Sequence, residues 1–342
     1  MKAKQRALVL GASGGIGGEL AVRLLQRGWE VHALQHRSRM TGTRGNGIYW
    51  WRGDAMQRED VLQAAKGASL IVHAVDSLLW RDTGSQPLAM LEHSIEAAVA
   101  NRARVLLPAP MSVYGAASGL LDEDAPQRPL GQRGLLQVRM EQRLQAATAE
   151  GAQALIVRSG DYFGPHAVRS WFSQALVEPG RALSSLRYPG RAGTGHAWCY
   201  LPDAAEAMLR LLERAERLGA FERFHLQGHW DADGGAMVAA IARAAAGARL
   251  RVKPFPWSLL RRSAPLLPLF RELSELRTHW QEPQRPDNRR LLALLGEEPR
   301  TDLDSAVRET LYAMGCIDSA APKRAAARKR KPAAGAALAA AA

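Results

Sequence analysis

Several kinds of residue and segment are scarce in this sequence of 342 residues, and each scarcity argues against a class of protein. The only two cysteines, Cys199 and Cys316, are far apart and lack metal-site spacing, so neither a disulfide framework nor a metal site is expected. This cysteine usage suits a reducing, cytoplasmic compartment. The apolar stretch after the first residues breaks into glycines at once, unlike a signal-peptide core. Arginines and prolines interrupt the most apolar run of the carboxyl half, residues 256–273, so no transmembrane segment is expected.

Acidic residues are also too few to balance the basic ones, and the formal net charge is +13. Residues 321–342 carry no acid and hold six of the cations, so removing them leaves the rest of the chain near +7. The same segment is rich in alanine and proline and lacks aromatic and β-branched residues, so it cannot bury enough apolar area to fold. We expect residues 319–342 to be a disordered basic tail. A solvated tail is favoured over one that binds nucleic acid or an anionic membrane.

What the sequence does have is an alternation of short apolar runs with helical periods. Residues 7–10 and 31–34 are typical of strands, and residues 16–26 between them form an amphipathic helix pattern. Further strand patterns follow at residues 48–51, 70–74, 104–107 and 154–157. This order predicts an α/β protein with a Rossmann-type, doubly wound parallel sheet.

The pattern changes after about residue 160, where loops rich in glycine, proline and tryptophan precede helix patterns at residues 203–215 and 235–246. We therefore expect an NAD(P)-binding domain over residues 1–160. Residues 161–318 are expected to form a smaller C-terminal substrate lobe with returning helices, closing over the carboxyl ends of the strands.

A glycine-rich turn joins the first predicted strand to the first helix. Gly11 permits a tight turn, Gly14 lets the backbone approach a pyrophosphate, and Gly17 lets helix and strand pack closely. The helix amino terminus then faces the phosphates. This context predicts a dinucleotide site and disfavours glycines that merely end a strand.

The end of the second predicted strand bears on which dinucleotide binds. There the sequence reads Gln35, His36, Arg37, Ser38, Arg39, with no carboxylate for the ribose hydroxyls and two guanidinium groups for a phosphate. NADP(H) is therefore favoured. NAD stays open as the alternative, because both arginines can also be solvated surface residues.

Further motifs follow in order: Gly53-Asp54, Val72-His73-Ala74-Val75, SVYG at 112–115, RSGDYFGP at 158–165 and YLPDAAEAM at 200–208. Together with GASGGIG they resemble the extended short-chain dehydrogenase/reductases, also called the NAD-dependent epimerase/dehydratase family. The resemblance implies a small-molecule substrate and a homodimer. With the glycine turn, it implies cofactor contacts at Gly11, Ser13, Gly14, Ile16, Gly17, Arg37, Asp54, His73 and Ala74.

The resemblance does not extend to the residues that the family uses for proton transfer. These are a tyrosine, a lysine four residues later, and a serine. Aligning PLGQRGLLQVRME on the family pattern puts Arg133 at the tyrosine and Gln137 at the lysine, while Pro110 holds the serine position. Between Lys4 and Lys323 the only lysines are Lys66 and Lys253, and neither is near the required helix. The member is therefore atypical and lacks the Tyr-x-x-x-Lys pair.

Four residues are candidates for the missing chemistry. His166 and His196 can move protons at neutral pH without a lysine, Tyr114 is a candidate acid, and Arg133 can hold an anionic substrate or the ribose. Purely structural roles stay open for both histidines.

These features favour an NADP(H)-dependent oxidoreductase or epimerase-like enzyme that acts on a small polar substrate with non-standard acid/base residues. The alternative is a catalytically inactive dinucleotide-binding sensor or regulatory protein. A nucleic-acid-associated protein tethered by the basic tail has the least support.

Overall fold

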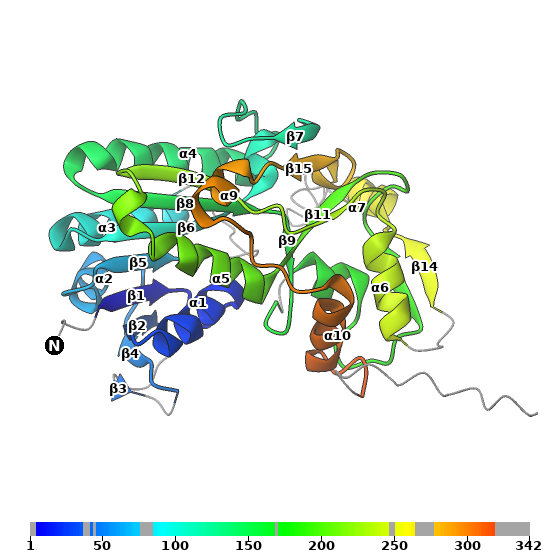
Figure 1. Ribbon diagram of the computed structural model, residues 1–342, viewed down its shortest axis with the longest axis horizontal. Coiled ribbons are helices and arrows are strands. Elements are labelled where there is room, and N and C mark those ends of the chain that lie inside the picture. Colours follow the sequence, from blue (N-terminus) through cyan, green and yellow to red (C-terminus); the bar gives the residue numbers. More distant parts are fainter. Residues whose placement is uncertain are drawn as a thin grey trace, which may run out of the picture.

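An eight-stranded sheet forms the centre of the molecule (Figure 1). The computed structural model describes residues 5–36, 42–43, 46–75, 85–167, 170–245, 250–263 and 277–318. The strand order is β12-β8-β6-β5-β1-β2-β4-β3. The strands are β1 (Arg6–Leu10), β2 (Glu30–Gln35), β3 (Gly42–Thr43), β4 (Tyr49–Arg52), β5 (Leu70–His73), β6 (Arg104–Pro110), β8 (Gln153–Ser159) and β12 (Phe221–His225). All neighbouring strands pair in parallel except β3 and β4, which confirms the predicted Rossmann-type sheet.

The order of the sheet reverses at β1, which lies between β2 on one side and β5 on the other. The chain passes from β1 to β2 and β4, and then crosses back to β5, β6 and β8. In doubly wound sheets, ligands bind outside the carboxyl ends of the strands at such a reversal. The glycine turn follows the carboxyl end of β1, so the fold places it at this point.

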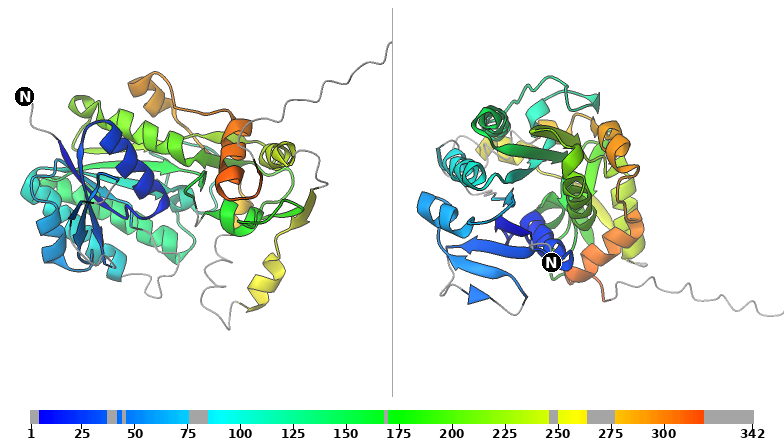
Figure 2. Two further views of the ribbon diagram at one scale, coloured as in Figure 1. Left: turned by 90° about the horizontal axis from the view of Figure 1, so that it is seen from below. Right: turned by 60° about the vertical axis from the view of Figure 1, so that its left-hand side comes forward.

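Helices cover both faces of the sheet, as two views show (Figures 1 and 2). One face packs against α1 (Gly15–Gln26), α5 (Leu201–Leu212) and α9 (Arg289–Leu295), and the other against α2 (Arg58–Ala64), α3 (Ser85–Asn101) and α4 (Gln132–Ala147). Alternate residues of β1 divide between the two cores, since Val9 belongs to the first and Leu8 to the second. Burial on both faces explains why the central strands are almost wholly apolar.

The chain beyond residue 160 contributes to both parts of the molecule. β12 pairs with β8 at the edge of the large sheet, and α5 packs beside α1. The predicted division at residue 160 therefore does not follow the layers, because the chain leaves the sheet after β8 and later returns to it. A purely local pattern does not reveal this return, which depends on pairing between distant segments.

A second lobe beside the sheet is built from three small sheets and short helices (Figure 1). Its strands are β7 (Gly119–Leu121), β9 (Asp161–Phe163), β10 (Ser185–Tyr188), β11 (His196–Tyr200), β13 (His229–Asp231), β14 (Arg251–Pro254) and β15 (Gln284–Pro286). Its helices are α6 (Ala236–Ala244), α7 (Trp257–Ser263) and α10 (Leu303–Ala313). Single turns, also found beside the large sheet, are η1 (Met111–Tyr114), η2 (Thr148–Glu150), η3 (Phe172–Leu176), η4 (Ala215–Arg217) and η5 (Thr278–Trp280).

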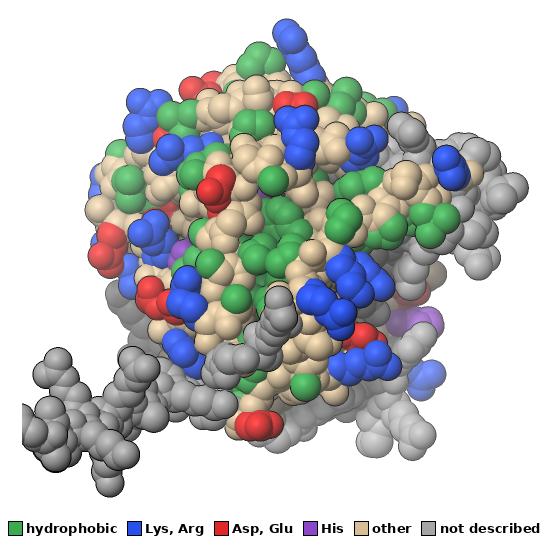
Figure 3. Space-filling view, turned by 90° about the vertical axis from the view of Figure 1, so that its right-hand side faces the viewer, with side chains coloured by type: hydrophobic (Ala, Val, Ile, Leu, Met, Phe, Trp, Pro, Cys, Tyr) green, Lys and Arg blue, Asp and Glu red, His purple; other side chains and the backbone are tan. Residues whose placement is uncertain are grey.

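An aromatic core holds this lobe together. Phe163, Phe172, Trp198 and Trp280 are all buried, and their rings contact one another or share neighbours. The lobe's outer face shows apolar side chains between prominent Lys and Arg side chains (Figure 3). In the described part of the chain, none of the helices has both the length and the apolar character needed to cross a membrane. The predicted tail, residues 319–342, lies outside the described residues.

Candidate active site

The three glycines of the turn after β1 differ in what surrounds them. Gly11 has a positive φ of 89°, and a Cβ there would lie 2.2 Å from the carbonyl oxygen of Ala74. A Cβ on Gly17 would lie 2.4 Å from the carbonyl oxygen of Gly11. At Gly14, in contrast, the nearest atom is that same oxygen at 3.3 Å, and the residue is exposed. The fold itself requires the first and third glycines, whereas Gly14 leaves open the space that a ligand's phosphates would need.

The amino terminus of α1 suits an anion at this place. Gly14 is its N-cap, no side chain caps the helix, and no acidic residue lies in its first turn. Ser13 is exposed beside Gly14, while Ile16 packs against the sheet's core. Backbone N–H groups at an uncapped helix start, free of nearby carboxylates, bind phosphate well. The described residues therefore fit the pyrophosphate of a dinucleotide.

Asp54 lies beside the end of β2, where the resemblance implies contact with the adenine end of the cofactor. Its Oδ2 is 3.5 Å from His36 Nδ1, and its Oδ1 accepts a hydrogen bond from the Met56 backbone at 3.0 Å. The carboxylate is partly exposed and held by its own loop. Arg37, on which the expected NADP preference depends, lies outside the described residues.

His73 and Ala74 end β5 opposite the glycine turn. The Ser94 hydroxyl on α3 donates to Met90 O and accepts from His73 Nδ1 at 2.9 Å. Burial lowers the pKa of His73 to about 4, so the ring is neutral near pH 7. Because its imidazole points toward α3, the backbone near Ala74 is the part of this strand end that faces Gly11.

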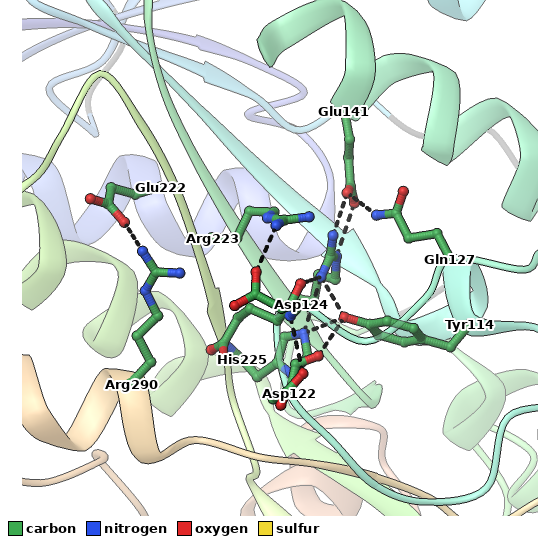
Figure 4. Close-up of polar contacts among 11 residues, drawn as sticks. Tyr114, Asp122, Asp124, Gln127, Glu141, Glu222, Arg223, His225 and Arg290 are labelled. Carbon is green, nitrogen blue, oxygen red and sulfur yellow. Dashed lines mark hydrogen bonds and ion pairs between the residues drawn. The ribbon is translucent and has the colours of Figure 1, made fainter.

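Tyr114 belongs to a buried polar network that joins η1, α4, β8 and β12 (Figure 4). Its hydroxyl donates to the Asp122 carbonyl at 3.0 Å, accepts from Arg158 Nη1 at 2.5 Å and lies 2.9 Å from His225 Nε2. Burial raises its pKa. Arg158 also binds both carboxylate oxygens of Glu141, and all of these side chains are buried. These contacts indicate a structural role for Tyr114.

His225 is held as a neutral ring in the same network. Its Nδ1 donates to the Leu121 carbonyl at 3.0 Å, which leaves Nε2 to accept from Arg158 Nη1 at 3.2 Å. Burial and the neighbouring Arg158 cation lower the pKa of His225 to about 3. The unprotonated ring therefore forms part of the packed core.

These two buried neutral histidines predict a loss of stability in acid. In the unfolded chain His73 and His225 titrate near the ordinary pKa of about 6.5, whereas in the folded chain they do not. Below that pH the unfolded state binds more protons, so the free energy of unfolding falls as the pH falls. We expect a loss of about 3 kcal/mol per histidine by about pH 4.

Urea unfolding at several pH values measures this loss of stability. His73→Asn should reduce the slope without abolishing it, because burial also lowers the pKa of other histidines, among them His225 and His279. A wild-type value that stays constant between about pH 7 and pH 5 would be the contradicting result.

A second polar cluster lies at the carboxyl ends of β6 and β8. We call Asp161, His196 and His279 the His–Asp–His cluster. Asp161 begins β9 directly after β8, and its Oδ2 is 2.8 Å from His196 Nε2 and 3.7 Å from His279 Nε2. Although burial opposes ionisation, the hydrogen bond from His196 and the proximity of the two imidazoles hold the pKa of Asp161 below its ordinary value. An ionised carboxylate thus lies between two imidazoles.

A ring stack and a glutamine amide hold the side chains of this cluster in place. The His196 ring stacks on Trp280 with centroids 3.8 Å apart and planes 7° apart. His279 Nδ1 lies 3.0 Å from Gln284 Oε1, and Gln284 Nε2 donates to the Gly115 carbonyl at 2.7 Å. Gly115 follows η1 at the end of β6, so this amide ties the cluster to the sheet's carboxyl edge. The side chains of Asp161 and His279 are 20% and 16% exposed, whereas His196 is 4% exposed.

The family model described as the NAD dependent epimerase/dehydratase family matches residues 7–226. The chain belongs to this family. Its members include enzymes, and the resemblance inferred from the motifs is thereby confirmed. No curated protein sequence matches this family member.

Solved structures of the same fold cover nearly the whole chain. MoeE5 in complex with UDP-glucuronic acid and NAD is 19% identical, with a TM-score of 0.70, over 90% of this chain and 98% of that chain. UDP-glucose 4-epimerase from Brucella ovis, in complex with NAD, is 17% identical with a TM-score of 0.69, over 91% and 98%. UDP-glucuronic acid 4-epimerase from Bacillus cereus is 16% identical with a TM-score of 0.68, over 91% and 99%. At these identities the likeness establishes the fold.

The motif alignment assigns the proton-transfer positions of this epimerase-family chain to Pro110, Arg133 and Gln137. Pro110 ends β6, and Arg133 lies half-buried in the first turn of α4. Gln137 is buried, and its amide donates to Glu141 Oε1 at 3.4 Å. Gln137 therefore supports the Arg158–Glu141 pair from the position at which the family pattern has a lysine.

The remaining sequence candidate, His166, is not a member of the cluster. It is exposed in the turn after β9, and its backbone oxygen would lie 3.2 Å from a Cβ on Gly15. It therefore neighbours the glycine turn. Sequence reasoning singled out His196 but missed His279, which comes from a segment without a motif; only the fold brings the two together.

Proposed function

We propose that this chain is an NADP(H)-dependent oxidoreductase or epimerase that acts on a small polar substrate, with the His–Asp–His cluster as its proton-transfer group. The observation that carries the proposal is the position of this cluster. Asp161 follows β8 directly, and Gln284 connects His279 to the end of β6. Both strand ends face the crevice side of a doubly wound sheet, where ligands of such sheets bind.

The chain's own residues supply the cofactor site. The open space beside Gly14 and the uncapped start of α1 would hold the pyrophosphate, and Asp54 would lie toward the adenine. When bound, the nicotinamide accepts or returns a hydride at a substrate carbon. The chain must then move a proton at the neighbouring oxygen, which a carboxylate between two imidazoles can do. The buried His196 holds Asp161 in position through its hydrogen bond, whereas the side chains of Asp161 and His279 are partly exposed to solvent.

The choice between cofactors rests on the segment after β2. Gln35 and His36 end this strand region without a carboxylate, and Arg37 and Arg39 follow. Guanidinium groups bind a phosphate in a forked geometry, which supports NADP(H) over NAD. The NAD held by several structural neighbours supports a nicotinamide dinucleotide in general.

The substrate class is supported by the same neighbours, two of which hold UDP-glucuronic acid. A sugar nucleotide has the hydroxyl-bearing carbons that hydride transfer needs. We therefore propose a sugar-like substrate, free or nucleotide-linked.

A spectroscopic screen tests this function. The purified chain is mixed with NADP+ or NAD+ and a panel of UDP-sugars and simple sugars, and the absorbance of reduced nicotinamide is followed beside product analysis by NMR. Turnover of at least one sugar, faster with NADP+, is expected. Cofactor binding with no turnover across the panel would contradict the enzyme and favour the sensor alternative, which the buried Gln137 at the lysine position already supports.

A further inference from the structure

We propose that Asp161, His196 and His279 bind one divalent transition-metal ion. This goes beyond the proposed function, in which the same ligand atoms hold a proton in place of the ion. The three residues offer one carboxylate oxygen and two imidazole nitrogens, and these ligand atoms all lie within 4.8 Å of one another. Ligands bound to one zinc ion at about 2.0–2.2 Å lie roughly 3–4 Å apart, so small side-chain movements would complete the site.

The hydrogen bonds around Gln284 determine which ring nitrogen of His279 carries the proton and which carries the lone pair. Gln284 Nε2 donates to the Gly115 carbonyl, so the oxygen of this amide is the atom that faces His279 Nδ1. An amide oxygen only accepts, and Nδ1 must therefore carry the proton. The neutral ring then presents the lone pair of Nε2 toward Asp161 Oδ2, at 3.7 Å.

Two hydrogen-bond acceptors that face each other are satisfied by a cation or by a hydrogen-bond donor between them. The separation of 3.7 Å is too long for a direct hydrogen bond. A metal ion would take the lone pair of His279, the carboxylate of Asp161 and the Nε2 of His196 once that nitrogen gives up its proton. A proton alone also satisfies the pair, and the experiment below separates the two.

The surroundings are those of a metal site with oriented ligands. Metal-binding histidines usually donate their second N–H to a carbonyl or carboxylate, as His279 does to Gln284. The ring of His196 is fixed by stacking on the buried Trp280. Both supports are already present without the ion.

The donor set indicates the class of metal. Two imidazoles with one carboxylate suit zinc, cobalt, iron or manganese, whereas calcium and magnesium prefer oxygen ligands alone. Because Asp161 and His279 are partly exposed, solvent can reach the site. With three protein ligands, at least one coordination position would stay open to water or to a substrate oxygen.

The test uses Co²⁺ as a spectroscopic probe on the full chain without cofactor. Titration should produce visible absorption bands that saturate at one equivalent, and Zn²⁺ should displace them. His279→Gln should weaken binding at least about 100-fold, and Gln284→Ala, which keeps all three ligands, about 10- to 100-fold. His93→Gln on α3 is the matched control and should bind as the wild type does. Circular dichroism of each variant shows that it folds.

The proposal would be overturned if excess Co²⁺ produced no visible absorption bands, or if the wild type and His279→Gln bound Co²⁺ with equal affinity. Either result would leave a cluster that exchanges protons only. Failure here is distinguishable from failure of the proposed function. Binding of NADPH is measured in the absence of metal, and metal binding in the absence of cofactor.

Discussion

Arg158→Met is expected to lower the free energy of unfolding by about 3–5 kcal/mol. Arg158 is fully buried, and its guanidinium binds both oxygens of Glu141 as well as the hydroxyl of Tyr114. Methionine fills a similar volume but leaves the Glu141 carboxylate buried with only the amides of Gln127 and Gln137. A buried charge that loses its partner keeps its desolvation penalty without compensation.

Urea unfolding of the single and double variants measures this effect. In Arg158→Met/Glu141→Leu the carboxylate is gone as well, so at least half of the lost stability should return. Glu222→Gln, which removes a partly exposed ion pair with Arg290, is the matched control and should change stability by less than about 1 kcal/mol. A change equally small in Arg158→Met would mean that the network adds little to the fold.

His196→Gln is expected to lower kcat about 10²- to 10⁴-fold on a substrate found in the sugar screen. Glutamine can still reach toward Asp161, but its amide, unlike an imidazole, does not exchange protons. The affinity for NADPH should stay unchanged, because the glycine turn belongs to another part of the crevice.

A pH profile separates this role from a merely structural one. The pH dependence of kcat should differ in shape between the wild type and His196→Gln, whereas a structural defect would lower activity equally at every pH. His93→Gln serves as the control histidine. Unchanged kcat in His196→Gln would remove the cluster from the mechanism and return attention to His166 and Arg133.

The cofactor end could be predicted from sequence because its determinants are local. Gly11, Gly14 and Gly17 follow one strand and open one helix, so spacing alone encodes their roles, and the strand patterns before residue 160 match strands of the sheet. The return of β12 to the sheet was missed, since it depends on pairing with β8 across a long excursion.

The substrate end was predicted only in part for the same reason. His196 was a candidate by its place near a motif, but His279 stands in a segment without one, and Asp161 joins them only through the fold. Tyr114 belongs to a motif and was a candidate acid, yet the structure surrounds its hydroxyl with Arg158, His225 and a carbonyl. Sequence patterns indicate which residues are chemically capable, but burial and partners decide which are available.

We propose that this epimerase-family chain binds a nicotinamide dinucleotide at the glycine turn and prefers NADP(H). Titration of the purified chain with NADPH and with NADH, following nicotinamide fluorescence, tests it most directly. We expect tighter binding of NADPH than of NADH, loss of this preference in Arg37→Ser, and loss of binding of both cofactors in Gly14→Asp. The new carboxylate would fill the open space beside residue 14 and repel the phosphates. Equal affinity of the wild type and Gly14→Asp, or no binding of either cofactor, would contradict it.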